Sequence, residues 1–295
     1  MNRLPLWFRQ EIPDKITLER ARLLAEANVR TVCQEARCPN LSFCFKHQKF
    51  TFIILGDTCT RNCRFCAVGK TENKNLKLDE DEPLRIAKVV KDLGLNYVVI
   101  TSVTRDDLAD GGAKIFSQTI ELIRRINSDI KIEVLIPDFK GSVSSLKVVL
   151  DAQPHLVGHN IETIERLYKD LRPKANYRIS LDILKKIKEI EPLLTTKSSI
   201  MLGLGETEEE VIKTMQDLLY SGCDILTLGQ YLAPSPIHYP VKDFIGIEQF
   251  QRYRDLGLGL GFKSVLSGPL VRSSYPDVPY QSHPHRVGVE GLKGK

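Results

Sequence analysis

Six of the seven cysteines fall in a short stretch of the chain and form two triplets of different spacing. The first triplet is Cys33-x4-Cys38-x5-Cys44, and the second triplet is Cys59-x3-Cys63-x2-Cys66. Cysteines that cluster within a long chain favour metal ligation in a reducing compartment over a secreted disulfide framework. Each triplet is one protein ligand short of the four that a closed metal site has. The seventh, Cys223, is predicted to be a small buried residue before a strand.

The second triplet places three thiols on one short loop. Three thiolates can hold three irons of a [4Fe–4S] cube and leave the fourth iron open. An open iron can bind the amine and carboxylate of S-adenosylmethionine, and an added electron then releases a 5′-deoxyadenosyl radical. The alternative is a zinc site, which usually has a second pair of Cys or His ligands. Only His47 is close in sequence, so we favour the cluster.

The elements that must position these thiols begin after residue 50, where short apolar runs alternate with segments of helical periodicity. The predicted strands are 51–55, 97–100, 131–136, 155–158, 200–202, 225–228 and 263–266. The predicted helices are 84–93, 114–126, 142–150, 161–170, 179–190, 208–220 and 247–256, the sixth of them with a capping box of Thr207 and Glu210. Strands separated by such helices imply a parallel sheet. We predict an α/β fold, a partial (β/α)6 TIM-like barrel with N- and C-terminal extensions.

The alternation divides the chain into three parts: an N-terminal extension of residues 1–50, a barrel of residues 51–266, and a C-terminal extension of residues 267–295. Polar side chains follow most of the predicted strands. The C-terminal ends of parallel strands form the active-site face of such folds. The second triplet follows the first strand and is therefore expected at the barrel mouth.

The composition is ordinary for a soluble globular protein, with 42% hydrophobic and 27% charged residues among 295. No apolar run reaches the length of a membrane helix, and prolines and charges interrupt the first twenty residues, so we predict neither a membrane span nor a signal peptide. We predict a cytoplasmic protein. The net charge of +5 is compatible with an acidic protein partner. No basic run is interleaved with aromatic residues, so nucleic-acid binding is not predicted.

Eight segments of the chain carry a resemblance to a known family. They are 33–40 (CQEARCPN), 51–59 (TFIILGDTC), 101–113 (TSVTRDDLADGGA), 133–139 (EVLIPDF), 159–163 (HNIET), 201–206 (MLGLGE), 227–232 (TLGQYL) and 268–275 (GPLVRSSY). The second triplet after the first strand resembles the radical S-adenosylmethionine superfamily. The first triplet together with Arg-Ser-Ser-Tyr at 272–275 is specific to the lipoyl synthases, which the whole pattern resembles.

The resemblance implies a sulfurtransferase that inserts two sulfur atoms at carbons 6 and 8 of an octanoyl chain. That chain is amide-linked to a lysine of a lipoyl carrier domain, either the E2 component of a 2-oxoacid dehydrogenase or the H protein of glycine cleavage. The implied cofactors are two [4Fe–4S] clusters and S-adenosylmethionine, with the auxiliary cluster as the sulfur source. A reducing electron donor such as ferredoxin or flavodoxin is also implied.

The resemblance also implies the ligands of both clusters. The auxiliary cluster takes the first triplet (Cys33, Cys38 and Cys44) and, as its fourth ligand, Ser274. The radical-forming cluster takes Cys59, Cys63 and Cys66. A serine oxygen is an unusual ligand for a soft iron–sulfur cluster, and it can dissociate more readily than a thiolate. Without the resemblance, Ser273-Ser274 would be interpreted as a loop. If Ser274 is a ligand, the C-terminal extension is expected to fold back over the barrel mouth.

Ser102, Asn160, Glu162 and Arg178 are the residues that the resemblance suggests for S-adenosylmethionine. Glu162 has an alternative interpretation as an acid in the first turn of a helix, where the helix dipole favours it. The alternative interpretation of Arg178 is a solvated helix residue. Arg272 is expected to orient the serine or to bind a substrate carbonyl, the alternative being a surface arginine.

Two other classes of protein remain open at this point. Another radical S-adenosylmethionine enzyme with an auxiliary cluster, such as a methylthiotransferase or a maturase, would ligate that cluster with cysteine elsewhere and would not need Arg272-Ser273-Ser274. A zinc-stabilised binding module would give no reason for polar residues at the strand ends. The chain also departs from the family pattern after Tyr275, where Pro276 follows.

Overall fold

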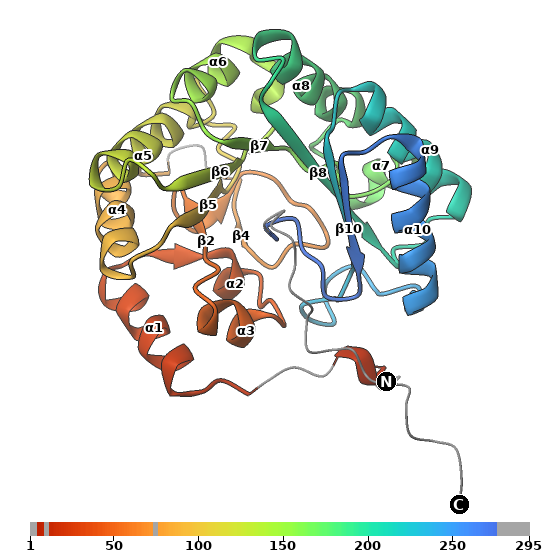
Figure 1. Ribbon diagram of the computed structural model, residues 1–295, viewed down its shortest axis with the longest axis horizontal. Coiled ribbons are helices and arrows are strands. Elements are labelled where there is room, and N and C mark those ends of the chain that lie inside the picture. Colours follow the sequence, from red (N-terminus) through yellow and green to blue (C-terminus); the bar gives the residue numbers. More distant parts are fainter. Residues whose placement is uncertain (1–4, 9–11, 73–75, 276–295) are drawn as a thin grey trace, which may run out of the picture.

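The computed structural model describes residues 5–8, 12–72 and 76–275, and its largest feature is a sheet wrapped into an open barrel (Figure 1). The sheet has the order β1-β2-β5-β6-β7-β8-β9-β10. These strands are β1 (Arg30–Thr31), β2 (Thr51–Ile54), β5 (Tyr97–Ser102), β6 (Lys131–Leu135), β7 (Leu156–Gly158), β8 (Thr195–Leu202), β9 (Ile225–Gln230) and β10 (Ser264–Gly268). Only β1 is antiparallel to its neighbour; within the described ranges the other strands pair in parallel.

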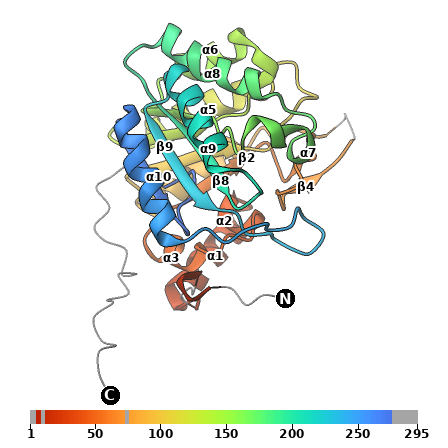
Figure 2. The same ribbon diagram turned by 90° about the vertical axis from the view of Figure 1, so that its right-hand side faces the viewer.

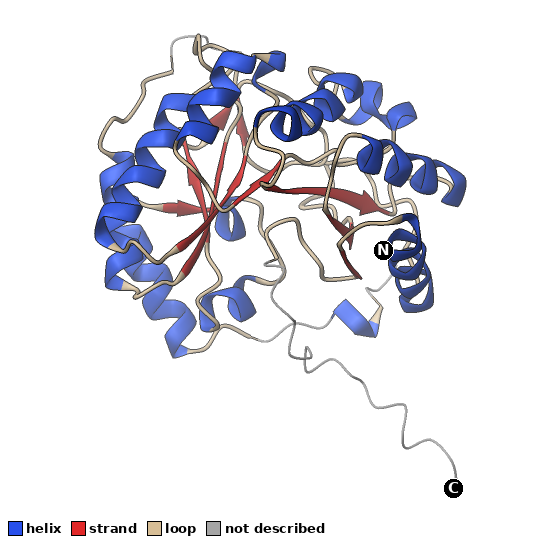
Figure 3. Ribbon diagram, turned by 45° about the horizontal axis from the view of Figure 1, so that its top comes forward, coloured by secondary structure: helices blue, strands red, loops and turns tan. Residues whose placement is uncertain are grey.

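Helices cover the outer face of the sheet and connect successive strands (Figure 3). The connecting helices are α4 (Glu82–Asp92), α5 (Ala113–Ile126), α6 (Val143–Asp151), α7 (Tyr168–Leu171), α8 (Tyr177–Ile190), α9 (Glu208–Tyr220) and α10 (Ile247–Leu260), with short 3-10 turns η2 (Phe139–Gly141) and η3 (Glu165–Leu167). This alternation confirms the predicted partial (β/α)6 barrel. The predicted capping box is also confirmed, since Thr207 and Glu210 cap α9 reciprocally.

Burial explains why the strands form where they do. Every residue of β2 and β9 is buried, as a parallel strand covered on both faces requires. Helix α5 instead buries one stripe, including Ile115, Phe116 and Ile120, and leaves its other face to solvent. The main hydrophobic core therefore lies between the sheet and the outer helices.

One predicted helix, 161–170, is wrong in its first half. Glu162 has a φ of 67°, which a helix cannot accommodate, and it forms a β-bridge with Ile200. The Ser198 hydroxyl accepts a hydrogen bond from the Ile161 backbone N–H at 3.1 Å. Helical structure begins only at η3, because Ile161 and Ile164 are buried against the barrel instead of forming an amphipathic stripe.

The N-terminal part contributes β1 at one edge of the sheet and a group of helices on one side of the barrel (Figure 2). These are α1 (Lys15–Glu26), α2 (Val32–Glu35) and α3 (Leu41–Lys46), preceded by the turn η1 (Leu6–Phe8). A second, smaller sheet pairs β3 (Thr58–Cys59) with β4 (Gly69–Lys70).

The chain after β10 turns into the middle of the barrel (Figure 1). The Tyr275 carbonyl accepts a hydrogen bond from Lys197 at 2.5 Å, and Lys197 is buried in β8. A Cβ on Gly229 would lie 2.1 Å from the Val271 carbonyl oxygen, so this segment passes directly over the β9 backbone. The segment therefore folds back across the C-terminal end of β9, as expected, but it does not stay over the barrel mouth: Tyr275 lies inside the barrel, beside Lys197 near the start of β8. Pro276 and the residues beyond it lie outside the described ranges.

Candidate active site

The loop with the second triplet leaves β2 at its C-terminal end and is tied to the loop that follows β5. The Thr60 backbone N–H and hydroxyl both donate to the Thr104 carbonyl at 3.0 Å. Arg105, which is 1% exposed, donates to the Leu76 carbonyl at 2.8 Å and pairs with Asp107. The same guanidinium donates to the Leu55 carbonyl at 3.5 Å, so it contacts both ends of the cysteine loop.

The three thiols of the second triplet are partly exposed and influence one another. Burial raises the pKa of Cys66 to about 12, and the neighbouring Cys63 and Cys59 raise it further. Burial also raises the pKa of Cys63, although Arg172 opposes that shift. The raised pKa values favour the thiol forms of Cys63 and Cys66, and ligation by iron would release their protons.

Arg61, inside the cysteine loop, joins two carboxylates from different loops. Its guanidinium donates to both Asp138 oxygens at 2.6 Å and to Asp106 at 2.9 and 3.1 Å. Burial would raise the pKa of Asp138, but the hydrogen bonds and charge of Arg61 lower it to about 2. Arg61 and Asp138 are therefore ionised at neutral pH. Through its contacts with Asp106 and Asp138, Arg61 cross-links the ends of β5 and β6 to the cysteine loop.

A cavity of about 130 Å³ lies at the C-terminal ends of β5, β6 and β7. Its polar lining consists of Arg61, Thr101, Ser102, Thr104, Asp138, His159, Asn160, Glu162 and Arg172. Ser102, Asn160 and Glu162, three of the residues suggested for S-adenosylmethionine, therefore share one cavity. The structure does not bring Arg178 there: its side chain is 65% exposed and pairs with Glu165 at 3.1 Å. The suggestion of Arg178 conflicts with this position on the outer surface of α8.

Three buried polar atoms from this lining have no hydrogen-bond partner within the described residues: Ser102 Oγ, His159 Nε2 and Arg172 Nε. His159 Nδ1 lies 2.9 Å from the Ile136 carbonyl, which can only accept, so Nδ1 carries the hydrogen and Nε2 is an acceptor. Burial lowers the pKa of His159 to about 4, which keeps the ring neutral. Unpaired buried polar groups are costly, and a polar ligand in the cavity would satisfy them.

Glu162 and Arg172 connect this cavity to the cysteines. Glu162 lies in the left-handed backbone region, where a non-glycine residue is strained, and its carboxylate accepts from Asn160 at 3.1 Å. Burial raises the pKa of Glu162, and Arg172 opposes the shift. Arg172 also lies within electrostatic reach of Cys63. The interpretation of Glu162 as a helix-turn acid is wrong, because it belongs to no helix.

The first triplet lies on two short helices and the turn between them. Cys33 is in α2, Cys44 is in α3, and the Cys38 backbone N–H donates to the Cys33 carbonyl at 3.0 Å. The Cys33 and Cys44 thiols are hydrogen-bonded; this contact and burial raise the pKa of Cys33 well above its usual value. Burial raises the pKa of Cys38, whereas the adjacent Arg272 guanidinium lowers it. Arg272 is thus a neighbour of this triplet.

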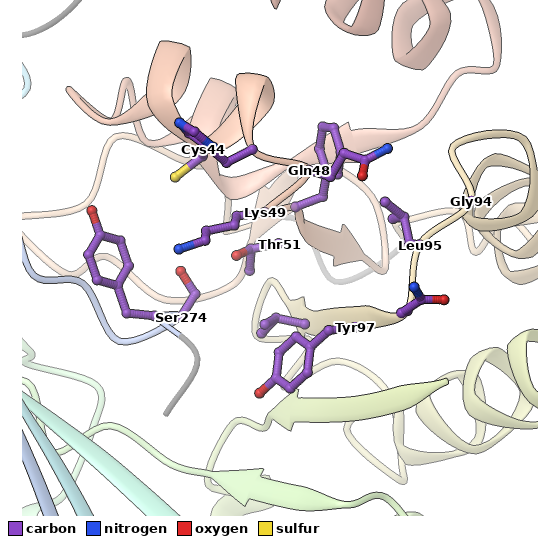
Figure 4. A pocket seen from close by; sticks show the side chains of 13 residues that line it. Cys44, Gln48, Lys49, Thr51, Gly94, Leu95, Tyr97 and Ser274 are labelled. Atoms are coloured by element: carbon purple, nitrogen blue, oxygen red, sulfur yellow. The ribbon is translucent and has the colours of Figure 1, made fainter. Parts of the chain in front are cut away.

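A second cavity, of about 260 Å³, opens beside the first triplet (Figure 4). It is lined by Cys44, His47, Gln48, Lys49, Phe50, Thr51, Gly94, Leu95, Asn96, Tyr97, Val99, Ser274 and Tyr275. In the view of Figure 4, the Cys44 sulfur, the Lys49 ammonium and the Ser274 hydroxyl point toward one another. Burial lowers the pKa of Lys49, and Cys44 opposes the shift. Ser274, far from Cys44 in sequence, therefore lines the same cavity.

The two cavities lie at opposite ends of strand β5. Tyr97 and Val99 line the larger one, and Thr101 and Ser102 line the smaller one. Tyr97, Val99 and Thr101 alternate along the strand and share its inner face. From Tyr97 to Ser102 the strand rises by about 16 Å, at roughly 3.3 Å per residue. The inner face of β5 thus runs from one cavity to the other.

The donor sets suit clusters better than single ions. Within the described residues, no three His, Cys, Asp or Glu side chains converge closely enough to hold one metal ion. In a [4Fe–4S] cube each cysteine binds a different iron, so the ligands stand further apart than around one ion. Three thiols at each end of β5 match that requirement in number and type.

Arg61, Arg172 and Lys49 were not identified from the sequence. Arg61 lies inside the second triplet, and that position was the only available signal. Arg172 follows a short helix with nothing in its neighbourhood to mark it, and Lys49 lies in a turn before β2. All three line a cavity only because loops distant in sequence meet at the ends of the barrel.

The fold is similar to solved structures of low sequence identity. SuiB of Streptococcus suis, in a structure bound to S-adenosylmethionine, has a TM-score of 0.53 at 14% identity over 75% of this chain and 50% of that chain. A methylornithine synthase has a TM-score of 0.52 at 14% identity over 93% of this chain and 88% of that chain. At these identities the similarity concerns the fold.

Among the described residues, no helix has the length and apolar character needed to cross a membrane.

Sequence comparisons are more specific. The profile of the radical SAM superfamily matches residues 53–218. A lipoyl synthase of Caldanaerobacter subterraneus subsp. tengcongensis is 50% identical over 92% of this chain and 95% of its own. A lipoyl synthase of Caldicellulosiruptor bescii is 53% identical over 90% of this chain and 89% of its own. Identity of this extent over both chains shows the family: the chain belongs to the lipoyl synthases, within the radical SAM superfamily.

Proposed function

We propose that the two ends of the barrel divide the work of the family's reaction between them. The second triplet and the smaller cavity bind the radical-forming cluster and S-adenosylmethionine, and the first triplet with Ser274 binds the cluster that donates sulfur. The observation that carries this proposal is the placement of a thiol triplet beside a cavity at each end of β5.

The chain is a radical SAM lipoyl synthase, and its cofactors are S-adenosylmethionine and [4Fe–4S] clusters. When bound, they supply a 5′-deoxyadenosyl radical for hydrogen abstraction and the sulfur that replaces the hydrogen. The protein's own contribution is to bind the cofactor and substrate, to orient them, and to hold each cluster at its place.

In the smaller cavity, three atoms without a hydrogen-bond partner among the described residues support specific roles. His159 Nε2 is an acceptor and suits a ribose hydroxyl, and Ser102 Oγ can donate or accept. Arg172 suits the methionyl carboxylate, which a guanidinium binds through paired hydrogen bonds. Asn160 and Glu162 remain candidates for the ribose hydroxyls or the amine. We therefore propose Arg172, in place of Arg178, as the cationic partner of S-adenosylmethionine.

The larger cavity suits the acyl chain of the substrate. Its apolar lining comes from Phe50, Leu95 and Val99, and it lies beside Cys44 and Ser274. An apolar chain that enters here would extend along the inner face of β5 toward the smaller cavity. Desolvation of the aliphatic carbons would favour binding. This arrangement brings the chain past the proposed sulfur donor.

We further propose the partners and the setting of the reaction. The substrate is an octanoylated lipoyl carrier domain, of the E2 component or the H protein, and a ferredoxin or flavodoxin supplies electrons. All seven cysteines are free, which suits the reducing cytoplasm. Residues 1–50 and 267–295 act as extensions of the barrel 51–266 that carry the ligands of the auxiliary cluster.

The direct test reconstitutes the protein anaerobically with iron and sulfide. We expect about eight irons per chain, from two cubes of four. Incubation with S-adenosylmethionine, reductant and an octanoyl-lysyl peptide is then expected to yield a lipoyl product and 5′-deoxyadenosine. About four irons, or zinc in their place, would contradict the proposal.

Two variants test the division of labour. Ser274→Ala is expected to retain 5′-deoxyadenosine formation and to lose sulfur insertion, whereas Cys63→Ala is expected to abolish cleavage of S-adenosylmethionine while the auxiliary cluster still assembles. Ser273→Ala is the matched control for Ser274→Ala and is expected to retain both activities. If Ser274→Ala stops cleavage of S-adenosylmethionine altogether, the assigned division is wrong.

A further inference from the structure

A buried ion pair in the middle of the barrel has no part in the reaction as described so far. Lys197 in β8 is 2% exposed, and its ammonium donates to Glu133 in β6 at 2.9 Å. Glu133 is 1% exposed, and its other carboxylate oxygen accepts from the Tyr97 hydroxyl. Two charges have therefore been removed from water inside the barrel.

Fold stability does not explain such a pair. Desolvation of two charges offsets most of their attraction, and an apolar pair of similar volume is often at least as stabilising. The third contact of the network is more informative. Lys197 also donates to the Tyr275 carbonyl at 2.5 Å, and Tyr275 directly follows Ser274. Lys197 therefore links the ion pair to the segment that carries Ser274, the proposed fourth ligand.

The same segment has a second anchor, on the loop of the first triplet. Asn40 is 2% exposed. Its side-chain amide nitrogen donates to the Leu270 carbonyl and to the Tyr275 hydroxyl, each at 2.7 Å. Asn40 lies between Cys38 and Cys44 in the chain, and its carbonyl accepts from the Cys44 backbone N–H at 2.8 Å. The anchor therefore connects residues 270–275 to the helix that presents Cys44.

We propose that Asn40 and Lys197 form a two-point clamp that positions Ser274 relative to the first triplet. Asn40 fixes the segment to the cysteine loop, and Lys197, held by Glu133 and Tyr97, fixes it to the barrel. Serine is a weakly held ligand of an iron–sulfur cluster. Contacts that fix the backbone on both sides of Ser274 would keep its hydroxyl close to the cluster. The inference rests on the proposed role of Ser274 and adds the residues that hold it. Lys197 and Asn40 are positioning residues, since neither is assigned to substrate or cluster.

The test compares Lys197→Met with a control that removes an ion pair between the outer helix α8 and the start of β9. Lys188 pairs with Asp224 at 2.5 Å, and neither residue contacts residues 270–275 in any hydrogen bond or ion pair of the described chain. Lys188→Met is therefore the matched control. Because Lys197→Met leaves Glu133 buried without its cation, the double variant Lys197→Met/Glu133→Leu, which removes both charges, is made as well.

We expect Lys197→Met and the double variant to form lipoyl product about 10- to 100-fold more slowly, the usual effect of losing a residue that orients a metal ligand. Formation of 5′-deoxyadenosine is expected to stay within about twofold. Hydrogen exchange of the peptide spanning residues 269–275 is expected to accelerate, with no such change in Lys188→Met. Asn40→Ala is expected to act in the same direction.

Exchange in residues 269–275 that matches the unmodified chain would overturn the clamp, as would an equal loss of 5′-deoxyadenosine and lipoyl product in the double variant. Failure of the proposed function has a different signature. If Ser274→Ala inserts sulfur normally, the ligand role itself is wrong. If Ser274→Ala blocks insertion while the Lys197 variants insert sulfur normally, only the clamp is rejected.

Discussion

Two arginines that look alike in the sequence have different environments in the folded chain. Arg178 is exposed and pairs with Glu165, an arrangement that contributes little to stability or binding. Arg172 is buried at the smaller cavity, close to Glu162 and Cys63, and its Nε atom has no partner among the described residues. At the scale of single residues, burial and an unsatisfied donor separate a functional arginine from a surface one.

Replacing each arginine by methionine tests this assignment. Arg172→Met is expected to weaken binding of S-adenosylmethionine by roughly 10- to 100-fold, because a hydrogen bond to a charged group contributes about 1.5–3 kcal/mol. Arg178→Met is the matched control, with an expected change below about twofold. Equilibrium dialysis of the reconstituted proteins measures both dissociation constants. Equal affinities in the two variants would return Arg178 to consideration, provided that thermal unfolding shows both folded.

At the scale of elements, the path of the segment after β10 depends on the absence of a side chain in β9. Val271 approaches Gly229 so closely that a Cβ would lie 2.1 Å from its carbonyl oxygen. The segment therefore reaches the first triplet along the inner face of the sheet, where Gly229 leaves room for its backbone. A strand glycine of this kind marks the close approach of another backbone.

Gly229→Ala is expected to displace residues 269–275 and to reduce sulfur insertion by about tenfold or more, since a shift of about 1 Å in a catalytic group can cost 10²-fold. Cleavage of S-adenosylmethionine should continue, because the displaced segment carries Ser274 and none of the second-triplet cysteines. Gly259→Ala in α10 is the control: among the described residues, no atom outside the local helix backbone lies within 4 Å of the added Cβ, and alanine favours the helix. Product formation by Gly229→Ala at the rate of the control would contradict the close approach.

At the scale of the whole molecule, 42 basic and 37 acidic residues give a net charge of +5. The larger cavity, where we propose that the acyl chain enters, includes Lys49 and His47 in its lining. A basic protein attracts an acidic carrier domain, and salt weakens the attraction because it shortens the range of electrostatic forces.

Raising the ionic strength from about 0.05 to 0.5 M is expected to lower kcat/KM for an acidic octanoylated carrier domain several-fold, as the Debye length falls to roughly a third. A short uncharged octanoyl-lysyl peptide is the control and should be turned over at a rate that changes little. Rates measured with both substrates at each salt concentration separate docking from general salt effects on the enzyme. A salt-insensitive rate with the carrier domain would argue against electrostatic docking.

The sequence predicted most of the chemistry and the order of the elements. The type and spacing of the six clustered cysteines indicated two sites with three donors each, and the alternation of apolar runs with helical periodicity predicted the barrel, because both signals are local in the chain. Local rules also predicted the capping box of α9 and the burial of Cys223, which is 2% exposed just before β9. They failed at 161–164, where contacts with β8 replace a helix.

Only the tertiary structure decided which distant residues meet. It brings Ser274 to the cavity of Cys44 by a path inside the barrel, places Arg172 at the smaller cavity and leaves Arg178 outside, and pairs Lys197 with Glu133 beneath Tyr275. No local pattern marks these contacts, because each depends on the curvature of the sheet and on the room that neighbouring strands leave inside it. The donor types are a property of the sequence, and their partners are a property of the folded barrel interior.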